Sequence, residues 1–276
     1  MCIRDRAKEG PDQILAPKGI GYYKDSFIIF TTNGLYRVGQ DGKVLSKKLL
    51  NDLPQVKEDG YGIAVPGLSI YFSVYSFFGF DASKGVVALP LYSYEKDATG
   101  EYPKKVLVIS CDDWSIRNEV EIDCPDIIKK EGDMQLLSCI NVLPHGDWLI
   151  YNFPASSKVC VYDLSAKKSK EYDFPSTFTD SFFRLPDMNE EEPGFGCLKT
   201  GYYFPLCYDA YHDVFWRVQQ GPLDGHGVAG KPFSVMCIST DLMNSAEYVI
   251  PAGSKIYPDL AFTDSLVLLP YTGGDK

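Results

Sequence analysis

Arg217 has the surroundings that most favour a specific chemistry, because it is the charged residue of the apolar run Val214–Val218. An unpaired charge is costly to bury, so a guanidinium in such a run must leave the apolar stack at its end or meet an acidic partner. Tyr208 and Asp209 lie shortly before the run. We therefore predict an anion or carboxylate site formed by Arg217, Tyr208 and Asp209. The alternative is a structural arginine paired with Asp209 or Asp213.

Two histidines are candidate general bases or metal ligands. His212 lies in the turn before the same run, and His226 lies in the glycine-rich loop GPLDGHG, two residues after Asp224. A zinc site needs three or four converging ligands, and one aspartate with one histidine at this spacing supplies too few. The sequence therefore predicts neither a metal nor a cofactor.

Catalysis on a glycan needs two positioned carboxylates. The chain has 37 aspartates and glutamates, so pairs of carboxylates are unavoidable and do not specify an active site. It has no G-x-S-x-G, Walker-type or H-E-x-x-H motif, which leaves nucleophilic, nucleotide and zinc-protease chemistry without support. We expect a non-enzymatic binding module. The alternative is a glycan hydrolase or lyase that uses loop carboxylates as acid and base.

Three tyrosines around one expected insertion are candidates for stacking on sugar rings. Tyr92, Tyr94 and Tyr102 lie before and within this part of the chain. Aromatic side chains of strands are also commonly half-buried, so ordinary strand packing is the alternative explanation.

The chain is acidic and has enough apolar residues for a core: it has 276 residues, of which 45% are hydrophobic, and a net charge of -10. Nucleic acids and anionic membranes attract clustered lysine and arginine, and the sequence has no such cluster. It also lacks the window of about eighteen apolar residues that a membrane span needs. The expected partner is therefore a peptide, a glycan or an envelope protein.

The cysteines favour core packing over chemistry. The chain has eight cysteines, none of them in a C-x-x-C pair. Several lie in strand-like runs such as KVCVY, where cysteine acts as a small hydrophobic residue. A disulfide, a metal site or a nucleophile are the alternatives.

The most regular feature of the sequence is a short turn followed by an apolar run, which occurs five times. The runs are residues 26–31, 86–92, 148–154, 214–218 and 265–271. Turns rich in aspartate and glycine join antiparallel neighbours. Runs that are apolar at nearly every position must be covered on both faces, as happens when propeller blades stack. Each run is therefore expected to be a strand near the inner edge of a blade.

A second hairpin is predicted after the first in four of the units, at residues 35–50, 106–122, 159–174 and 233–250. The turns of these hairpins carry Asp41, Asp113, Asp163 and Asp241. In three units a glutamate follows the aspartate, namely Glu119, Glu171 and Glu247. The unequal spacing of the units predicts four-stranded blades with long insertions at residues 97–104, 174–200 and 219–231.

These patterns predict an all-β fold: an incomplete β-propeller with about four four-stranded blades plus a partial blade, out of a ring of about six. Helix signals are few, at residues 125–132 and at residues 47–56, where Pro54 interrupts. We expect residues 7–276 to form a single propeller domain that is truncated at both ends. Such a domain would be an open arc whose terminal blades have exposed edges.

Residues 1–6 are expected to be non-native. Their sequence, MCIRDR, is what the codons ATG-TGT-ATA-AGA-GAC-AGx would give, and it resembles the transposon end used to prepare sequencing libraries. These residues then carry no information on the fold. A genuine N-terminus that matches by chance is the alternative. On the first interpretation a signal peptide or lipid-anchor cysteine would be missing from the sequence.

Residues 201–271 combine a Tyr-Asp turn, an aromatic strand that ends in arginine, and a later strand that closes on a glutamate. The matching residues are Tyr208, Asp209, Tyr211, Phe215, Trp216, Arg217 and the stretch from Phe233 to Glu247. This pattern resembles the domain of unknown function 4221 family, lipoprotein-like chains found largely in gut Bacteroides and their relatives. The resemblance implies a six-bladed-propeller-like fold and an exported, lipid-anchored protein of the cell envelope, in the periplasm or at the outer membrane. It implies no activity. The cysteines other than Cys2 would fit a reducing compartment better.

Overall fold

The computed structural model has an all-β chain built from antiparallel sheets. It describes residues 14, 17–62, 78–93, 95–96, 103–126, 139–178, 201–221, 232–251, 254, 256 and 260–269. The chain divides into two compact units. Residues 1–64, 77–123 and 143–149 form one unit, and residues 65–76, 124–142 and 150–276 form the other.

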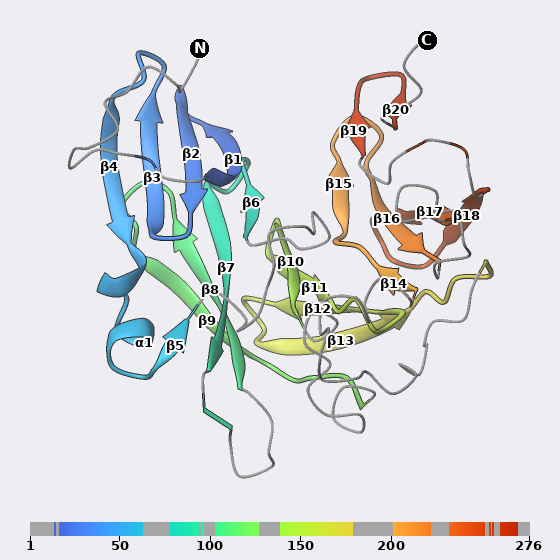
Figure 1. The fold of residues 1–276 in the computed structure, drawn as a ribbon, viewed down its shortest axis with the longest axis horizontal. Helices are drawn as coiled ribbons and strands as arrows, with labels where there is room; N and C mark the ends of the chain where they lie inside the picture. The colour runs from blue at the N-terminus through green and yellow to red at the C-terminus, as the bar shows by residue number, and fades with distance from the viewer. Residues whose placement is uncertain are drawn as a thin grey trace, which may run out of the picture. The chain divides into compact units, whose positions relative to one another are not determined.

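The first blade is the sheet drawn in blue in Figure 1, with its strands side by side in chain order. The strands are β1 (Pro17–Tyr23), β2 (Ser26–Thr31), β3 (Gly34–Gly39) and β4 (Val44–Leu49). Lys24 and Asp25 form the turn between β1 and β2, and both have a left-handed backbone with φ of 44° and 57°. A two-residue hairpin turn requires this conformation, because its twist matches that of the flanking strands.

The second blade contains β5 (Tyr61–Gly62), β6 (Gly79–Asp81), β7 (Val86–Ser93), β8 (Lys104–Ser110) and β9 (Ile116–Ile122). Both β5 and β6 pair with β7, so the first strand of this blade consists of two short pieces. A 3-10 turn (Leu50–Asp52) and the short helix α1 (Pro54–Lys57) connect the first blade to the second. Pro54 begins α1 instead of interrupting a helix, because a proline at the first helical position loses no intrahelical hydrogen bond.

The third blade is the sheet β10 (Asn141–His145), β11 (Trp148–Asn152), β12 (Lys158–Asp163) and β13 (Lys168–Asp173). The fourth blade contains β14 (Tyr202–Tyr203), β15 (Cys207–Asp209), β16 (Val214–Gln220), β17 (Phe233–Ser239) and β18 (Ser245–Ile250). Here again two short pieces, β14 and β15, pair with the same strand, β16. The hairpin of β19 (Ala261–Phe262) and β20 (Val267–Leu268) follows.

All five predicted apolar runs contain a strand, namely β2, β7, β11, β16 and β20. The four second hairpins are β3–β4, β8–β9, β12–β13 and β17–β18. The prediction of an all-β chain made of four-stranded blades is therefore confirmed. A closed ring, an open arc and a single domain all depend on how the two units are placed, so these stay predictions. The expected insertions lie mostly outside the described residues.

The aspartates that mark the second hairpins share one local geometry. In each case the Oδ1 atom accepts a hydrogen bond from the backbone N–H two residues later, at 2.9 to 3.0 Å; the donors are Lys43, Ser115, Ser165 and Met243. Aspartate stabilises a tight turn in this way because its side chain replaces a backbone acceptor. The residues after Asp113 and Asp241, Trp114 and Leu242, both have a left-handed backbone with φ near 60°. The repeated aspartate is thus a turn residue.

The first two blades pack through alternating small and large residues. A side chain added at Gly19 would collide with the ring of Phe78, and one added at Gly21 would collide with the ring of Phe80. At the end of the same strand Tyr23 fills the space over Gly85. Because residues 19, 21 and 23 share one face of β1, glycine in this strand permits close approach of the next blade. Ile28, Phe30 and other buried residues of the two blades form the core behind this contact.

The described cysteines are mostly buried. Cys111, Cys124, Cys139 and Cys160 are buried, whereas Cys207 and Cys237 are half-buried. Burial raises the pKa of Cys111 to about 12 and that of Cys160 to about 11, which keeps both thiols protonated at neutral pH. Packing in the core, as predicted, is confirmed for the four buried residues. Cys2 and Cys197 lie outside the described residues.

In the part of the chain that the structure describes, no helix is long and apolar enough to cross a membrane.

Candidate functional site

Arg217 of β16 has none of its surface exposed to solvent. Its Nη1 atom donates to the carbonyl oxygen of Ser157 at 2.9 Å, and its Nη2 atom donates to that of Phe174 at 2.5 Å. The guanidinium lies 4.2 Å over the ring centre of Tyr203. Burial lowers the pKa of Arg217 to about 10, so it remains charged at neutral pH. Arg217 therefore binds two backbone carbonyls at the end of the β12–β13 hairpin.

Two further side chains hold the segment that leaves this hairpin. We call residues 174–178 the strap. The hydroxyl of Tyr203 accepts a hydrogen bond from the backbone N–H of Ser176 at 3.0 Å. Glu247 of β18 accepts from the Ser176 hydroxyl at 2.5 Å and from the Thr177 N–H and hydroxyl at 2.7 and 2.6 Å. Arg217, Tyr203 and Glu247, which we call the clamp, thus fasten the strap to the fourth blade.

Asp209 lies on the opposite face of the sheet from Arg217. Consecutive residues of a strand point to opposite faces, and the side chain of Trp216, next to Arg217, donates to Asp209 Oδ2 at 3.2 Å. Arg217 pairs with neither Asp209 nor Asp213, so the structural-arginine alternative was wrong about its partner. Tyr208 and Asp209 are neighbours in β15, and Arg217 lies away from Asp209 on the other face of the sheet. Anion binding by these residues stays a prediction.

Asp209 is fully buried although it lies at the end of β15, next to an exposed turn. Its Oδ1 atom accepts from the backbone N–H groups of Tyr211 and His212, and its Oδ2 atom lies 2.6 Å from His212 Nδ1. Burial alone would raise the pKa of Asp209, but hydrogen bonds from His212, Trp216 and the backbone outweigh it and lower the pKa. The ionised carboxylate accepts a hydrogen bond from Nδ1–H, which fixes the imidazole and directs Nε2 away from Asp209.

The turns at this end of the fourth blade carry large exposed side chains. Tyr211 is 64% exposed and Met243, in the neighbouring β17–β18 turn, is 70% exposed. Asp213 links the two turns, because it accepts from Tyr208 at 3.0 Å and from Thr240 at 3.5 Å. We call Tyr208, Asp209, Tyr211, His212, Asp213 and Met243 the turn surface. It combines a fixed imidazole with an exposed aromatic ring.

The glutamates predicted from the repeat occupy equivalent positions in three outer strands. Glu119, Glu171 and Glu247 lie opposite Leu107, Cys160 and Met236 across the sheet. Each accepts a hydrogen bond from the residue two positions before its partner: Lys105, Lys158 and Ser234 at 2.5 to 2.6 Å. Glu119 also accepts a hydrogen bond from Gln55, which lies in the segment after the first blade. In the same way Glu247 accepts hydrogen bonds from the strap, which lies after the third blade. In both cases the glutamate ties its blade to the segment leaving the previous one.

The clamp should make stability depend on acid pH through Glu247. Burial alone would raise the pKa of Glu247, but hydrogen bonds from Ser176, Ser234 and Thr177 outweigh it and lower the pKa below its usual 4.5. The unfolded chain then binds more protons, so the stabilisation is complete above about pH 4.5 and is lost as pH falls through the folded pKa. Glu247→Gln should cost about 1 kcal/mol at pH 7 and much less near pH 3.

Urea unfolding at the two pH values measures this difference. The control is Glu121→Gln, which removes an exposed carboxylate of β9 and leaves the clamp intact. An equal cost of Glu247→Gln at both pH values would mean that ionisation of this carboxylate does not stabilise the fold.

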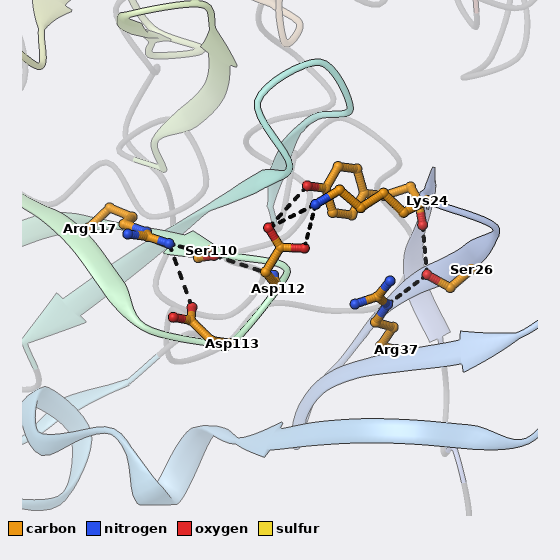
Figure 2. Close-up of polar contacts among 8 residues, drawn as sticks. Lys24, Ser26, Arg37, Ser110, Asp112, Asp113 and Arg117 are labelled. Atoms are coloured by element: carbon orange, nitrogen blue, oxygen red, sulfur yellow. Dashed lines mark hydrogen bonds and ion pairs between the residues drawn. The ribbon is translucent and has the colours of Figure 1, made fainter.

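A second polar cluster joins the turns of the first and second blades. Figure 2 shows Lys24 and Asp112 pointing toward one another; the Lys24 ammonium lies 2.9 Å from Asp112 Oδ1. Tyr23 also donates to Asp112, at 3.2 Å, and Arg37 donates to the Ser26 hydroxyl at 2.8 Å. Hydrogen bonds with Tyr23 and Asp112 raise the pKa of Lys24. No sequence pattern predicts this cluster, because its members come from distant hairpins.

The remaining candidate residues from the sequence either pack in a strand or lie outside the described residues. Tyr92 is 7% exposed and belongs to the buried strand β7, so strand packing explains it. His226, Asp224, Tyr94 and Tyr102 lie outside the described residues. Among the described residues, no group of three or more His, Cys, Asp or Glu side chains could hold a metal ion.

The repeated four-stranded antiparallel meanders are blades of the β-propeller type. A family model described as a domain of unknown function, DUF4221, matches residues 5–243, and the chain belongs to this family. The crystal structure of a DUF4221 member from Bacteroides vulgatus is similar to this chain, with a TM-score of 0.66 and 15% identity. The similarity covers 95% of this chain and 74% of that one, and at this identity it supports the fold alone.

More distant similarities carry no weight for fold or function. The Pan2 WD40 domain of Neurospora crassa has a TM-score of 0.41 and 8% identity, over 86% of this chain and 52% of that one. A protein of Bacteroides fragilis described as exported has a TM-score of 0.37 and 11% identity, over 88% of this chain and 73% of that one. No curated protein matches the chain.

Proposed function

We propose that this chain is a non-enzymatic glycan-binding protein of the bacterial cell envelope, and that the turn surface of the fourth blade is its recognition site. The observation that carries the proposal is the buried carboxylate of Asp209, which fixes the His212 ring beside the exposed ring of Tyr211. The peptide and envelope-protein partners considered from the sequence are the alternatives.

A fixed polar side chain on an exposed turn favours binding, because little conformational entropy remains to be lost when a ligand is bound. The His212 ring is 37% exposed, whereas the carboxylate that orients it is inaccessible. Trp216 and two backbone N–H groups hold that carboxylate in turn. The imidazole is thus presented in one orientation before any ligand arrives.

The chemistry of the surface suits a sugar. His212 Nε2 is available for a hydrogen bond with a sugar hydroxyl, which can both donate and accept. The exposed ring of Tyr211 offers an apolar face against which sugar C–H groups pack, and half-buried Tyr208 packs on Phe215 nearby. Asp209 and Asp241 accept hydrogen bonds within their own turns, and Asp213 accepts from Tyr208 and from Thr240 of the neighbouring turn, so their described contacts are those of structural residues. This favours recognition over acid–base catalysis.

The envelope location is part of the proposal. Its support is the family resemblance, which implies an exported and lipid-anchored protein. Detection of the native protein in membrane or periplasmic fractions of its source bacterium would test it independently of ligand binding.

Binding can be tested on an array of bacterial and host polysaccharides, followed by calorimetry on the best ligand. Tyr211→Ala and His212→Ala are each expected to weaken binding about tenfold or more. Tyr22→Ala, which removes another half-exposed tyrosine from the first blade, should leave the affinity unchanged. The proposal fails if no glycan binds saturably, if both turn variants bind like wild type, or if the protein cleaves the polysaccharide.

A further inference from the structure

The outer strands of three blades can be aligned on their equivalent glutamates, Glu119 in β9, Glu171 in β13 and Glu247 in β18. Within the described residues each of these strands is the last in its sheet, so one edge of its backbone has no strand partner. Natural proteins protect such edges with charged side chains, because an unprotected edge pairs with another strand. The three edges differ in this protection.

The residue after the glutamate is a tyrosine in both β13 and β18. In β13 the ammonium of Lys170 lies 4.4 Å over the centre of the Tyr172 ring. In β18 the position equivalent to Lys170 is Ala246, and Tyr248 is 72% exposed. The lysine that covers the tyrosine of β13 is therefore absent from β18.

The next position shows the same contrast. It is an exposed acid in two of the strands, Glu121 in β9 and Asp173 in β13, but in β18 it is Val249, which is 43% exposed. Glu247, the one charged residue of β18, is engaged with the strap and with Ser234. The outer edge of β18 consequently has an apolar residue at position 249, where the other two edges have a carboxylate, and it lacks the lysine of β13.

We propose that β18 pairs with β18 of a second copy of this chain, antiparallel about a two-fold axis at Tyr248. In this register Tyr248 faces Tyr248 of the second copy, Glu247 faces Val249, and Ala246 faces Ile250. Side chains directly opposite across an antiparallel pair interact, and like charges there are destabilising. When β18 pairs with itself in this register, no two like charges lie opposite each other.

The same register is unfavourable for the other two strands. Pairing β9 with itself about Val120 would place Glu119 opposite Glu121, and pairing β13 about Tyr172 would place Glu171 opposite Asp173. Two carboxylates would face each other twice in each of these dimers. Self-pairing is therefore allowed at one edge and opposed at the two equivalent ones, which is why we assign a second copy as the occupant.

A dimer of this kind is isologous, since the same strand of both copies forms the contact. One pair of strands buries less surface than a standard permanent interface, so we expect a weak and reversible dimer. The pairing is centred on Tyr248 within β18, whereas Tyr211 and His212 of the turn surface lie in the turn between β15 and β16, so glycan binding and dimerisation can fail separately.

Sedimentation velocity over a concentration series measures the dimerisation. Wild type is expected to shift from monomer to dimer as the concentration rises. In Val249→Glu the new carboxylate would lie opposite Glu247 of the other copy, so the dimer dissociation constant should rise about tenfold. Val249→Lys has the matched opposite charge and should preserve or tighten the dimer. Both variants alter an exposed position, and thermal unfolding checks that each is folded.

Hydrogen exchange gives an independent readout, because amides of β18 should become more protected as the concentration rises while those of β9 and β13 should not. The proposal is overturned if wild type is monomeric throughout the series. It is also overturned if Val249→Glu and Val249→Lys change the dimerisation equally, since the effect would then not come from the charge opposite Glu247.

Discussion

Arg217→Ala is expected to lower the free energy of unfolding by about 3 kcal/mol. The substitution removes a fully buried side chain and leaves a cavity, which alone costs about 2–5 kcal/mol for large residues. It also leaves the carbonyl of Phe174 without the donor that now lies 2.5 Å away. Relief of the cost of burying a charge, seen in the lowered pKa of Arg217, offsets part of this loss. Urea unfolding followed by tryptophan fluorescence measures the net effect.

Arg217→Met distinguishes the contribution of the hydrogen bonds to stability from that of the side-chain volume. Methionine fills most of the space over Tyr203 and carries no charge, but it offers no donor to Ser157 or Phe174. We expect it to cost about 1–2 kcal/mol, less than alanine. If methionine and alanine cost the same, the hydrogen bonds of the clamp would be its main contribution and the packing on Tyr203 a minor one.

The same variants test the anion site expected from the sequence. Loss of binding to an anionic ligand with unchanged stability would favour that site. Loss of stability together with release of the strap, detected as faster hydrogen exchange at Ser176 and Thr177, would favour the clamp. Because Arg217 has no exposed surface, we expect the second result.

The strands were predictable because their physical signal is local. The run SFIIFT is apolar at nearly every position and coincides with β2 (Ser26–Thr31), which is buried along most of its length. The turn at Lys24 and Asp25 is a two-residue connection whose residue types tolerate a left-handed backbone. The broken first strands, with β14 and β15 separated by Phe204-Pro205-Leu206, gave only a weak signal because each piece is too short to show a period.

The candidate site was predictable only in part. A lone arginine in VFWRV indicated a charge that needs a partner, and the structure buries it against two backbone carbonyls. Its partners are carbonyl groups, which every residue possesses, so no sequence pattern could name Ser157 or Phe174. His212 was noted as a candidate base, but its support comes from a buried carboxylate three residues earlier, a contact that depends on the turn geometry. The contact between the first two blades was also unpredicted, because a glycine in a strand does not tell which distant ring, here Phe78 or Phe80, packs against it.

Gly21→Val should destabilise the contact between the first two blades by about 3 kcal/mol. Even the first carbon of the new side chain would lie closer to the ring of Phe80 than the 3.0 Å below which real contacts of this kind essentially never occur. The ring cannot move away freely, because Phe80 packs against the core that Ile28, Phe30 and their neighbours form. The strand β1 must therefore separate from the second blade, or the core must repack. Ile20→Val, at an exposed position of the same strand, should cost less than about 1 kcal/mol.

A double-mutant cycle identifies the collision as the cause. Phe80→Ala removes the ring that meets residue 21 and should itself destabilise the fold by leaving a cavity. Combined with Gly21→Val, it opens the space that the valine needs, so the double variant should lose less stability than the two single losses together. The expected coupling is about 1–3 kcal/mol. Additive losses would mean that Gly21 is required by the backbone of β1 and not by the aromatic ring of the neighbouring blade, which would remove the basis for the small-to-large packing at Gly19 and Gly85 as well.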